Sequence, residues 1–119
     1  MRRYCSILFL MLLTAACYRP APEPEFNMAE VIPEDTMVVL MTEMQLIDGA
    51  MNLRAKEGKP MADYASAYSQ QVLDKHGISR ESFTESIRYY SYYIEKMNAI
   101  YEQVIIKLGT IESEVNKKE

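Results

Sequence analysis

Cysteine and histidine are scarce in this chain, and tryptophan is absent. The 119 residues include two cysteines, Cys5 and Cys17, and a single histidine, His76. Both cysteines lie near the N-terminus, so no disulfide framework can staple the remainder of the chain. His76 has no second histidine and no nearby cysteine with which to form a zinc site. We therefore expect neither a metal nor a cofactor.

Positive charge is also in short supply. The chain has 13 Lys and Arg residues against 17 Asp and Glu residues, which gives a formal net charge of −4. Binding to nucleic acid requires a cluster of Lys and Arg to neutralise phosphates, and the sequence contains no such cluster. We therefore expect no nucleic-acid partner, and anionic lipid headgroups are also poor candidates.

No apolar run is long enough to span a membrane. The longest runs from Cys5 to Ala16, whereas a spanning helix needs roughly 20 apolar residues. The run follows Arg2 and Arg3 and ends in small residues, a pattern typical of a signal peptide. We expect residues 1–16 to be removed, which would lower the net charge to −6 because two arginines leave with them.

The end of this leader, Leu13-Thr14-Ala15-Ala16-Cys17, resembles the lipobox of bacterial lipoproteins. The resemblance implies that Cys17 becomes the new N-terminus and is lipidated on its sulfur, and more than one acyl chain gives stable membrane anchoring. Thr14 departs from the Leu that is usual at this position. The alternative is an ordinary secretory signal with a chance cysteine at its end. Tyr18 stands where inner-membrane lipoproteins carry Asp, so we expect an outer-membrane location on the periplasmic face.

Three prolines follow the cysteine at every second position: Pro20, Pro22 and Pro24. Such spacing favours an extended, polyproline-like chain over a helix. We interpret residues 17–31 as the lipidated cysteine and a semi-rigid tether. From Tyr18 to Val31 it could hold a domain up to about 40 Å from the lipid, at roughly 3.1 Å per residue.

Residues 32–119 carry apolar side chains at steps of three and four, which predicts helices, and no strand-like alternation. The pattern predicts one helix from Pro33 to Lys56 and a second from about Met61 to Lys75. An apolar seam then continues from Arg80 to Val115, either as one helix or as two with a bend near Ser91 to Ile94, where aromatic and β-branched residues lower helix propensity. The fold class is therefore all-α, a small bundle of three or four helices with antiparallel neighbours joined by short turns.

The turn between the second and third predicted helices is well specified. Gly77 can end the second helix in a left-handed conformation, and Ser79 can cap the start of the next helix. Ile78 and Phe83 occupy the two positions of a hydrophobic staple. We expect His76 to act as a cap at the helix end and not as a catalytic base.

Three blocks of residues bear a resemblance to a known family: Ile32–Met37 with Leu40 and Glu43–Leu46; Lys75–Ile78 with Phe83, Ser86–Ile87 and Tyr89–Tyr90; and Tyr101, Val104 and Leu108. Their order is similar to that of small lipoproteins of Gram-negative, Bacteroidetes-type bacteria that carry the domain of unknown function 4296. The resemblance implies a compact helical lipoprotein without a known reaction. That family often has Asn-Pro in place of Tyr92 to Ile94, which favours a break there, and often has His in place of Gln45.

Tyrosine is the most unusual component, with nine residues, of which Tyr89, Tyr90, Tyr92 and Tyr93 fall within five positions. Side chains so close together project around most of a helix, so they cannot all enter one core. Tyrosine is enriched at binding surfaces because its rigid ring gives a large contact area. We predict that these four residues bind an envelope protein partner. An aromatic plug where the helix bends is an equally good interpretation.

The remaining candidates are weaker. Thr36, in Asp35-Thr36-Met37, matches a short bacterial O-glycosylation motif. Glu43 with Asp48 is the pair that an enzyme would require, although a solvated helix face explains both. The methionines of the first helix could line a ligand cavity, although an ordinary core is the simpler interpretation. We therefore expect a non-enzymatic interaction module, with a carrier of a small hydrophobic ligand or lipid as the alternative.

Overall fold

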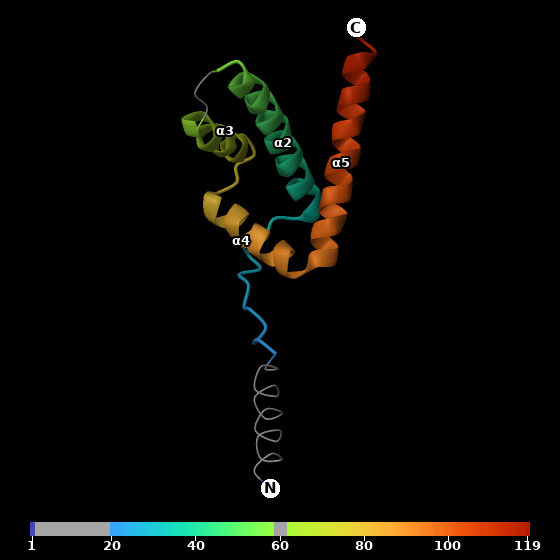
Figure 1. Ribbon diagram of the computed structural model, residues 1–119. Coiled ribbons are helices and arrows are strands. Elements are labelled where there is room, and N and C mark those ends of the chain that lie inside the picture. The colour runs from blue at the N-terminus through green and yellow to red at the C-terminus, as the bar shows by residue number, and fades with distance from the viewer. Residues whose placement is uncertain (2–19, 59–61) are drawn as a thin grey trace.

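The computed structural model describes Met1, residues 20–58 and residues 62–119. This part of the chain forms four helices and no strand: α2 (Glu34–Lys56), α3 (Ala62–Lys75), α4 (Arg80–Tyr92) and α5 (Ile94–Asn116) (Figure 1). The prediction of an all-α fold with three or four helices is confirmed. The predicted signal peptide and Cys17 lie outside the described residues. None of the described helices has both the length and the apolar character needed to cross a membrane.

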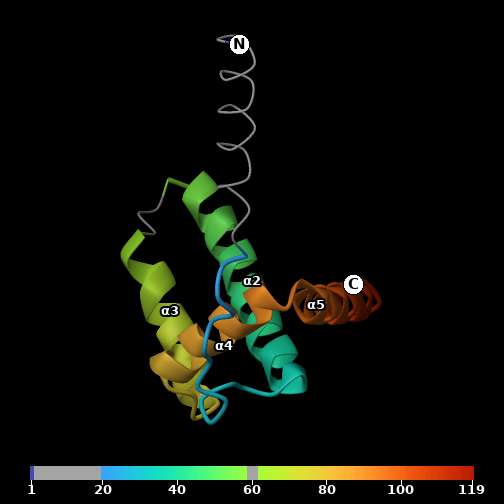
Figure 2. The same ribbon diagram turned by 90° about the horizontal axis from the view of Figure 1, so that it is seen from below.

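Helix α2 is the centre of the arrangement. It packs against α5 on one side and against α3 on the other, while α4 crosses below them (Figures 1 and 2). Helix α3 returns antiparallel to α2, as predicted. Helices α3 and α4 do not pack along their lengths, so our expectation that they would be antiparallel neighbours is wrong. Instead α2 and α5, which are distant in sequence, start side by side and run in the same direction.

The core lies where α2, α3, α4 and α5 meet. Met37, Leu40 and Ile100 are fully buried, because the steps of three and four place Met37 and Leu40 on one face of α2. The other buried apolar residues are Ile32, Val38, Val72, Leu73, Tyr90, Met97 and Val104. The apolar face of α2 is therefore ordinary core over its first half.

The helix ends follow the predicted turn chemistry. Gly77 has a φ of +66°, and the backbone N–H of Ile78 donates to the carbonyl of Leu73 at 2.9 Å, so Gly77 ends α3 in the left-handed conformation. The Ser79 hydroxyl accepts from the N–H of Ser82 and caps α4. Pro33 forms the N-cap of α2, so this helix begins one residue later than predicted.

The predicted bend separates α4 from α5 at Tyr93. This residue has a ψ of 76°, outside the helical region. Its N–H still donates to the carbonyl of Tyr89, and its own carbonyl accepts from the N–H of Met97 in the first turn of α5. Because of this break, α4 and α5 meet at an angle. Helix α5 can therefore lie along α2 while α4 crosses below it.

Candidate interaction surface

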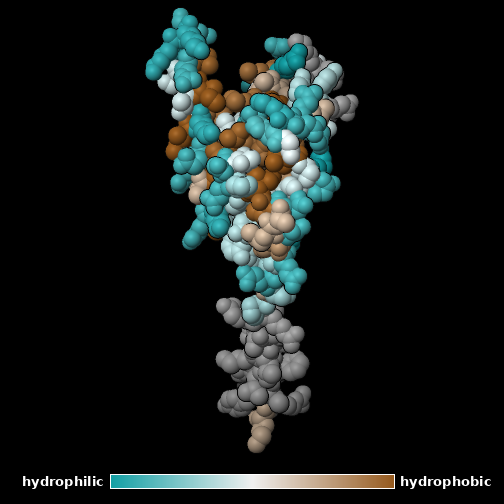
Figure 3. All heavy atoms as spheres, turned by 180° about the vertical axis from the view of Figure 1, so that it is seen from behind, coloured by the Kyte–Doolittle hydropathy of each residue, from teal (hydrophilic) through white to brown (hydrophobic). Residues whose placement is uncertain are grey.

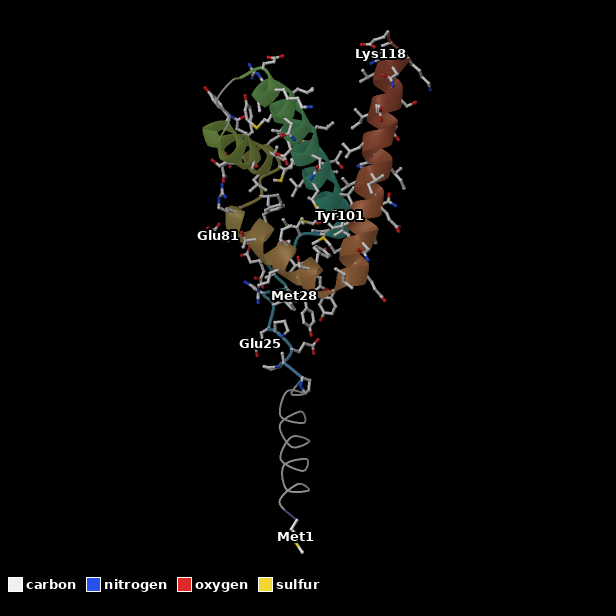
Figure 4. The ribbon with its side chains drawn as sticks, viewed as in Figure 1. Met1, Glu25, Met28, Glu81, Tyr101 and Lys118 are labelled. Atoms are coloured by element: carbon white, nitrogen blue, oxygen red, sulfur yellow. The ribbon has the colours of Figure 1, made fainter. Side chains whose placement is uncertain are left out.

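Residues 23–32 lie along α4, and we call this segment the strap. Figure 2 shows it crossing α4, and Figure 4 places Glu25 and Met28 below that helix. The N–H of Asn27 donates to the Glu85 carboxylate at 2.8 Å, and the Arg88 guanidinium donates to the carbonyl of Glu25 at 2.7 Å. Hydrogen bonds donated by the Arg88 guanidinium and by the N–H of Asn27 lower the pKa of the Glu85 carboxyl below its ordinary value. Residues 23–31 of the predicted tether are thus held against the domain.

The strap ends in a buried hydrogen-bond site. The N–H of Ile32 donates to the Ser86 hydroxyl at 2.8 Å, and the carbonyl of Ile32 accepts from the Tyr90 hydroxyl at 2.7 Å. Ser86 and Tyr90 are 0% and 3% exposed. Burial, assisted by the negative charge of Glu34, raises the pKa of Tyr90 to about 12. Tyr90 is therefore a core residue that also holds the strap.

Phe26 of the strap inserts among the other three tyrosines. Its ring centroid lies 5.2 Å from that of Tyr89, 5.6 Å from Tyr92 and 6.0 Å from Tyr93, within the range of favourable aromatic pairs. The Arg88 guanidinium stacks 4.8 Å from the Phe26 centroid. Sequence reasoning missed Phe26, although an aromatic residue in an otherwise polar, proline-rich stretch was a usable signal.

The four predicted tyrosines differ sharply in exposure. Tyr90 is buried, Tyr89 and Tyr93 are half-buried, and Tyr92 is 48% exposed. Ile94, which follows Tyr93 in the sequence, is 60% exposed. We call Tyr92, Tyr93 and Ile94 the base patch. One of the four tyrosines therefore belongs to the core, while Tyr92 remains accessible, and partner binding stays a prediction.

Tyr93 and Tyr89 also carry polar contacts at this end of the molecule. The Tyr93 hydroxyl donates to the Glu23 carboxylate at 3.2 Å, and desolvation together with this carboxylate raises the pKa of Tyr93. Lys96 donates to the Tyr89 hydroxyl at 3.2 Å. The base patch thus combines apolar ring surface with polar hydroxyls. This combination suits a protein interface whose rim contacts water.

Glu43 is the centre of a separate polar cluster between α2 and the end of α3. Its carboxylate accepts from the Lys75 ammonium at 3.0 Å and lies 3.1 Å from Nε2 of His76. Desolvation acts to raise the pKa of Glu43, but the bonds and charges of Lys75 and His76 outweigh it and lower the pKa. The sequence did not reveal this contact of His76, which is a link between helices. Asp48, also on α2, is exposed.

Two grooves follow the contact between α2 and α5. The larger, of about 480 Å³, is lined by the apolar residues Val38, Ala99 and Ile100 together with charged residues that include Glu34, Asp35 and Lys107. The smaller, of about 250 Å³, is mostly apolar and is lined by Met41, Gln45, Tyr101, Val104, Ile105 and Leu108. Figure 4 shows Tyr101 where the two helices meet.

Two further site predictions can be placed. Thr36 is half-buried in the first turn of α2, and its N–H donates to the Asp35 carboxylate. Its modification stays a prediction. In residues 20–58 and 62–119, no group of three or more His, Cys, Asp or Glu side chains is arranged to hold a metal ion.

Comparison with known proteins gives one match. The profile of a family described as "Domain of unknown function (DUF4296)" matches residues 29–114. No curated protein and no solved structure matches the chain.

Proposed function

The chain belongs to the DUF4296 family, a family of unknown function, and from that premise we propose that it is a membrane-anchored, non-enzymatic module that binds a protein of the cell envelope. The base patch carries this proposal. Tyr92 and Ile94 expose apolar surface beside Tyr93, at a corner that the strap has already fixed in place. A rigid aromatic surface loses little entropy on binding, which favours it as a contact for a partner.

The strap supports a fixed relation between this patch and the membrane. If Cys17 carries lipid, only residues 17–22 separate the lipid from the strap, and a chain of that length spans at most about 20 Å at roughly 3.1 Å per residue. In Figure 1 the described chain leaves the domain below α4, on the side where α4 and α5 meet. The base patch would then face the membrane-proximal space, within reach of another envelope protein.

The anchor is tested by the full chain in a bacterial envelope. The mature N-terminal fragment should have the mass of a cysteine with acyl chains, and Cys17→Ala should move the protein out of the membrane fraction. Survival of the membrane association in Cys17→Ala would contradict the anchor.

The partner is tested with a photo-crosslinking amino acid at position 92 of the full chain. Position 64 is the matched control, because Tyr64 is 55% exposed but lies on α3. We expect a discrete crosslinked protein from position 92 and none from position 64. Tyr92→Ala should reduce co-purification of that protein at least tenfold, while Tyr64→Ala should not. Equal crosslinking from both positions, or an unchanged yield with Tyr92→Ala, would rule out this surface.

The second candidate function is a carrier of a small hydrophobic ligand or lipid. The apolar groove between α2 and α5 is the observation that favours it. Its volume of about 250 Å³ is below the roughly 300–1,000 Å³ of typical ligand sites, and the larger groove of about 480 Å³ is bordered by the charged residues Glu34, Asp35 and Lys107, which suit a hydrophobic ligand poorly. We therefore prefer the protein partner. Extraction of a stoichiometric lipid from the purified full chain would reverse this preference.

A further inference from the structure

A line of apolar side chains runs along α5 from the base patch. Ile94, Tyr101 and Ile105 are 60%, 48% and 67% exposed, and Leu108 is half-buried. Steps of seven, four and three residues place these four side chains on one face of the helix, over about 21 Å at roughly 1.5 Å per residue. Figure 3 shows apolar side chains along α5. We call this line the α5 stripe, and it continues the base patch toward the C-terminus.

Three residues of the α5 stripe form one wall of the smaller groove between α2 and α5. Tyr101, Ile105 and Leu108 line the groove from α5, while Met41 and Gln45 line it from α2. Its volume of about 250 Å³ is small for a free ligand. Pockets that hold one anchor side chain are typical of the centre of a protein interface. The groove therefore suits a single large apolar side chain that a partner supplies.

The end of the groove where α2 and α5 diverge (Figure 1) is acidic. Glu112 and Asp48 lie seven residues after groove-lining residues of α5 and α2, so each continues the same helix face. Both are exposed, and none of the ion pairs within the described part of the chain involves either one. Lys107 borders the larger groove instead, and Lys56 lies at the end of α2. A basic side chain of a partner would therefore be attracted to this end.

We propose that the partner of the base patch also places a helix along the α5 stripe, with one large apolar side chain in the groove and a Lys or Arg one turn away, between Asp48 and Glu112. This docking rests on the proposed function, because Ile94 belongs both to the base patch and to the α5 stripe. The partner segment is thereby specified as a basic, amphipathic helix that binds in a groove.

The structure favours such a helix over other occupants. Residues 20–58 and 62–119 contain no strand, so an extended peptide would find no sheet edge with which to pair its backbone N–H and C=O groups. A helix pairs these groups internally. A second copy of this chain that docked through the same face would bring further carboxylates to an acidic end, and an anionic lipid surface would also add negative charge. Opposite charge therefore favours a basic protein partner.

The test places a photo-crosslinking amino acid at position 105 of the full chain in a bacterial envelope. Position 106 is the matched control, because Ile106 is 59% exposed on another face of the same helix. Position 105 should capture the same protein as position 92, with roughly fivefold more product than position 106. Mass spectrometry of the crosslinked peptide should locate an apolar residue with Lys or Arg three or four positions away, within a helical pattern.

Charge reversal gives a second measurement that does not depend on folding, because the changed residues are exposed. Glu112→Lys or Asp48→Lys should each lower the yield from position 105 about fivefold, since an exposed ion pair contributes modestly. Glu114→Lys, at an exposed position on another face of α5, is the control and should leave the yield unchanged.

Equal capture at positions 105 and 106, unchanged capture in both charge variants, or a captured segment that is acidic or extended would each overturn this docking. So would a product that contains only lipid or a second copy of this chain. Capture at position 92 without capture at position 105 would overturn the helix along the α5 stripe and leave the base patch as the interface, whereas no capture at either position would overturn both.

Discussion

The apolar face of α5 has the same residue spacing in both halves of the helix, but its side chains are buried in the first half and more exposed in the second. Ile100, in the first half, is 1% exposed, whereas Val115, in the second half, is 53% exposed. The difference arises from the neighbour, because α2 packs against the first half of α5 and diverges from the second (Figure 1). Periodicity therefore identifies a face, but only the adjacent helix decides whether that face is buried.

The first half belongs to the base of the molecule, where the strap adds a second source of order. Ile32 donates to Ser86 and accepts from Tyr90 in a buried site, so the chain before α2 is part of the fold. The second half of α5 extends beyond this base, and Val115 there is exposed. We infer that the base gives most of the stability and that the second half of α5 gives an accessible surface.

The largest effect should come from truncating one apolar residue in each half of α5. Ile100→Ala should lower the free energy of unfolding by about 2–5 kcal/mol, because it leaves a cavity in the core. Val115→Ala, on the same apolar face in the second half, should change it by less than about 0.5 kcal/mol, as at other exposed sites. Urea unfolding of the purified protein measures both. Similar losses for the two substitutions would end the distinction between the halves.

Ser86→Ala tests the strap. The substitution leaves the buried N–H of Ile32 without an acceptor, so we expect a loss of about 1–3 kcal/mol. Ser91→Ala, at an exposed position of the same helix, is the control and should be nearly neutral. Hydrogen exchange should accelerate at residues 25–32 in the first variant alone. Unchanged hydrogen exchange at residues 25–32 in Ser86→Ala would show that Ser86 does not hold the strap.

The base also shows how far sequence reasoning could go. The helices, the left-handed Gly77, the cap at Ser79 and the break near Tyr93 depend on residues close together in the chain, and all were predictable. The strap depends on Ile32 meeting Ser86 and Tyr90, more than 50 residues away. Local pattern carries no information on such a pairing, and the prolines indicated only an extended chain.

The candidate site was predictable in part for the same reason. Four tyrosines within five positions identified the region, but not which ring would turn inward, because that depends on where α4 crosses the strap. The contact of Glu43 with Lys75 and His76 was also missed, since it joins α2 to α3. The shared direction of α2 and α5 follows from the corner at Tyr93, whose angle no sequence pattern fixes.

Tyr90→Phe should have a smaller effect that depends on pH. The pKa of Tyr90 is raised to about 12, above the value near 10 expected in the unfolded chain. Its contribution to stability is therefore complete below pH 10 and is lost as the pH rises toward 12. At neutral pH the lost hydrogen bond to Ile32 should cost about 1 kcal/mol. The difference in unfolding free energy between the parent and Tyr90→Phe should shrink between pH 10 and 12, and a constant difference would argue against a protected hydroxyl.

The smallest effect concerns Glu43, which links α2 to the end of α3. Lys75 and His76 lower its pKa despite desolvation, so its contribution to stability is present above the ordinary carboxyl value of 4.5 and is lost as the pH falls through the lower, folded value. The carboxylate is 27% exposed, and solvent screening should limit the contribution to less than about 1 kcal/mol. Glu43→Gln should therefore weaken the protein slightly at pH 6 and have little effect at pH 3, as measured by urea unfolding. Asp48→Asn, at an exposed position on the same helix, should show no such change with pH. If Glu43→Gln instead destabilised the protein as much as Ser86→Ala, the link between α2 and α3 would rank with the strap, and stability would not be concentrated at the base.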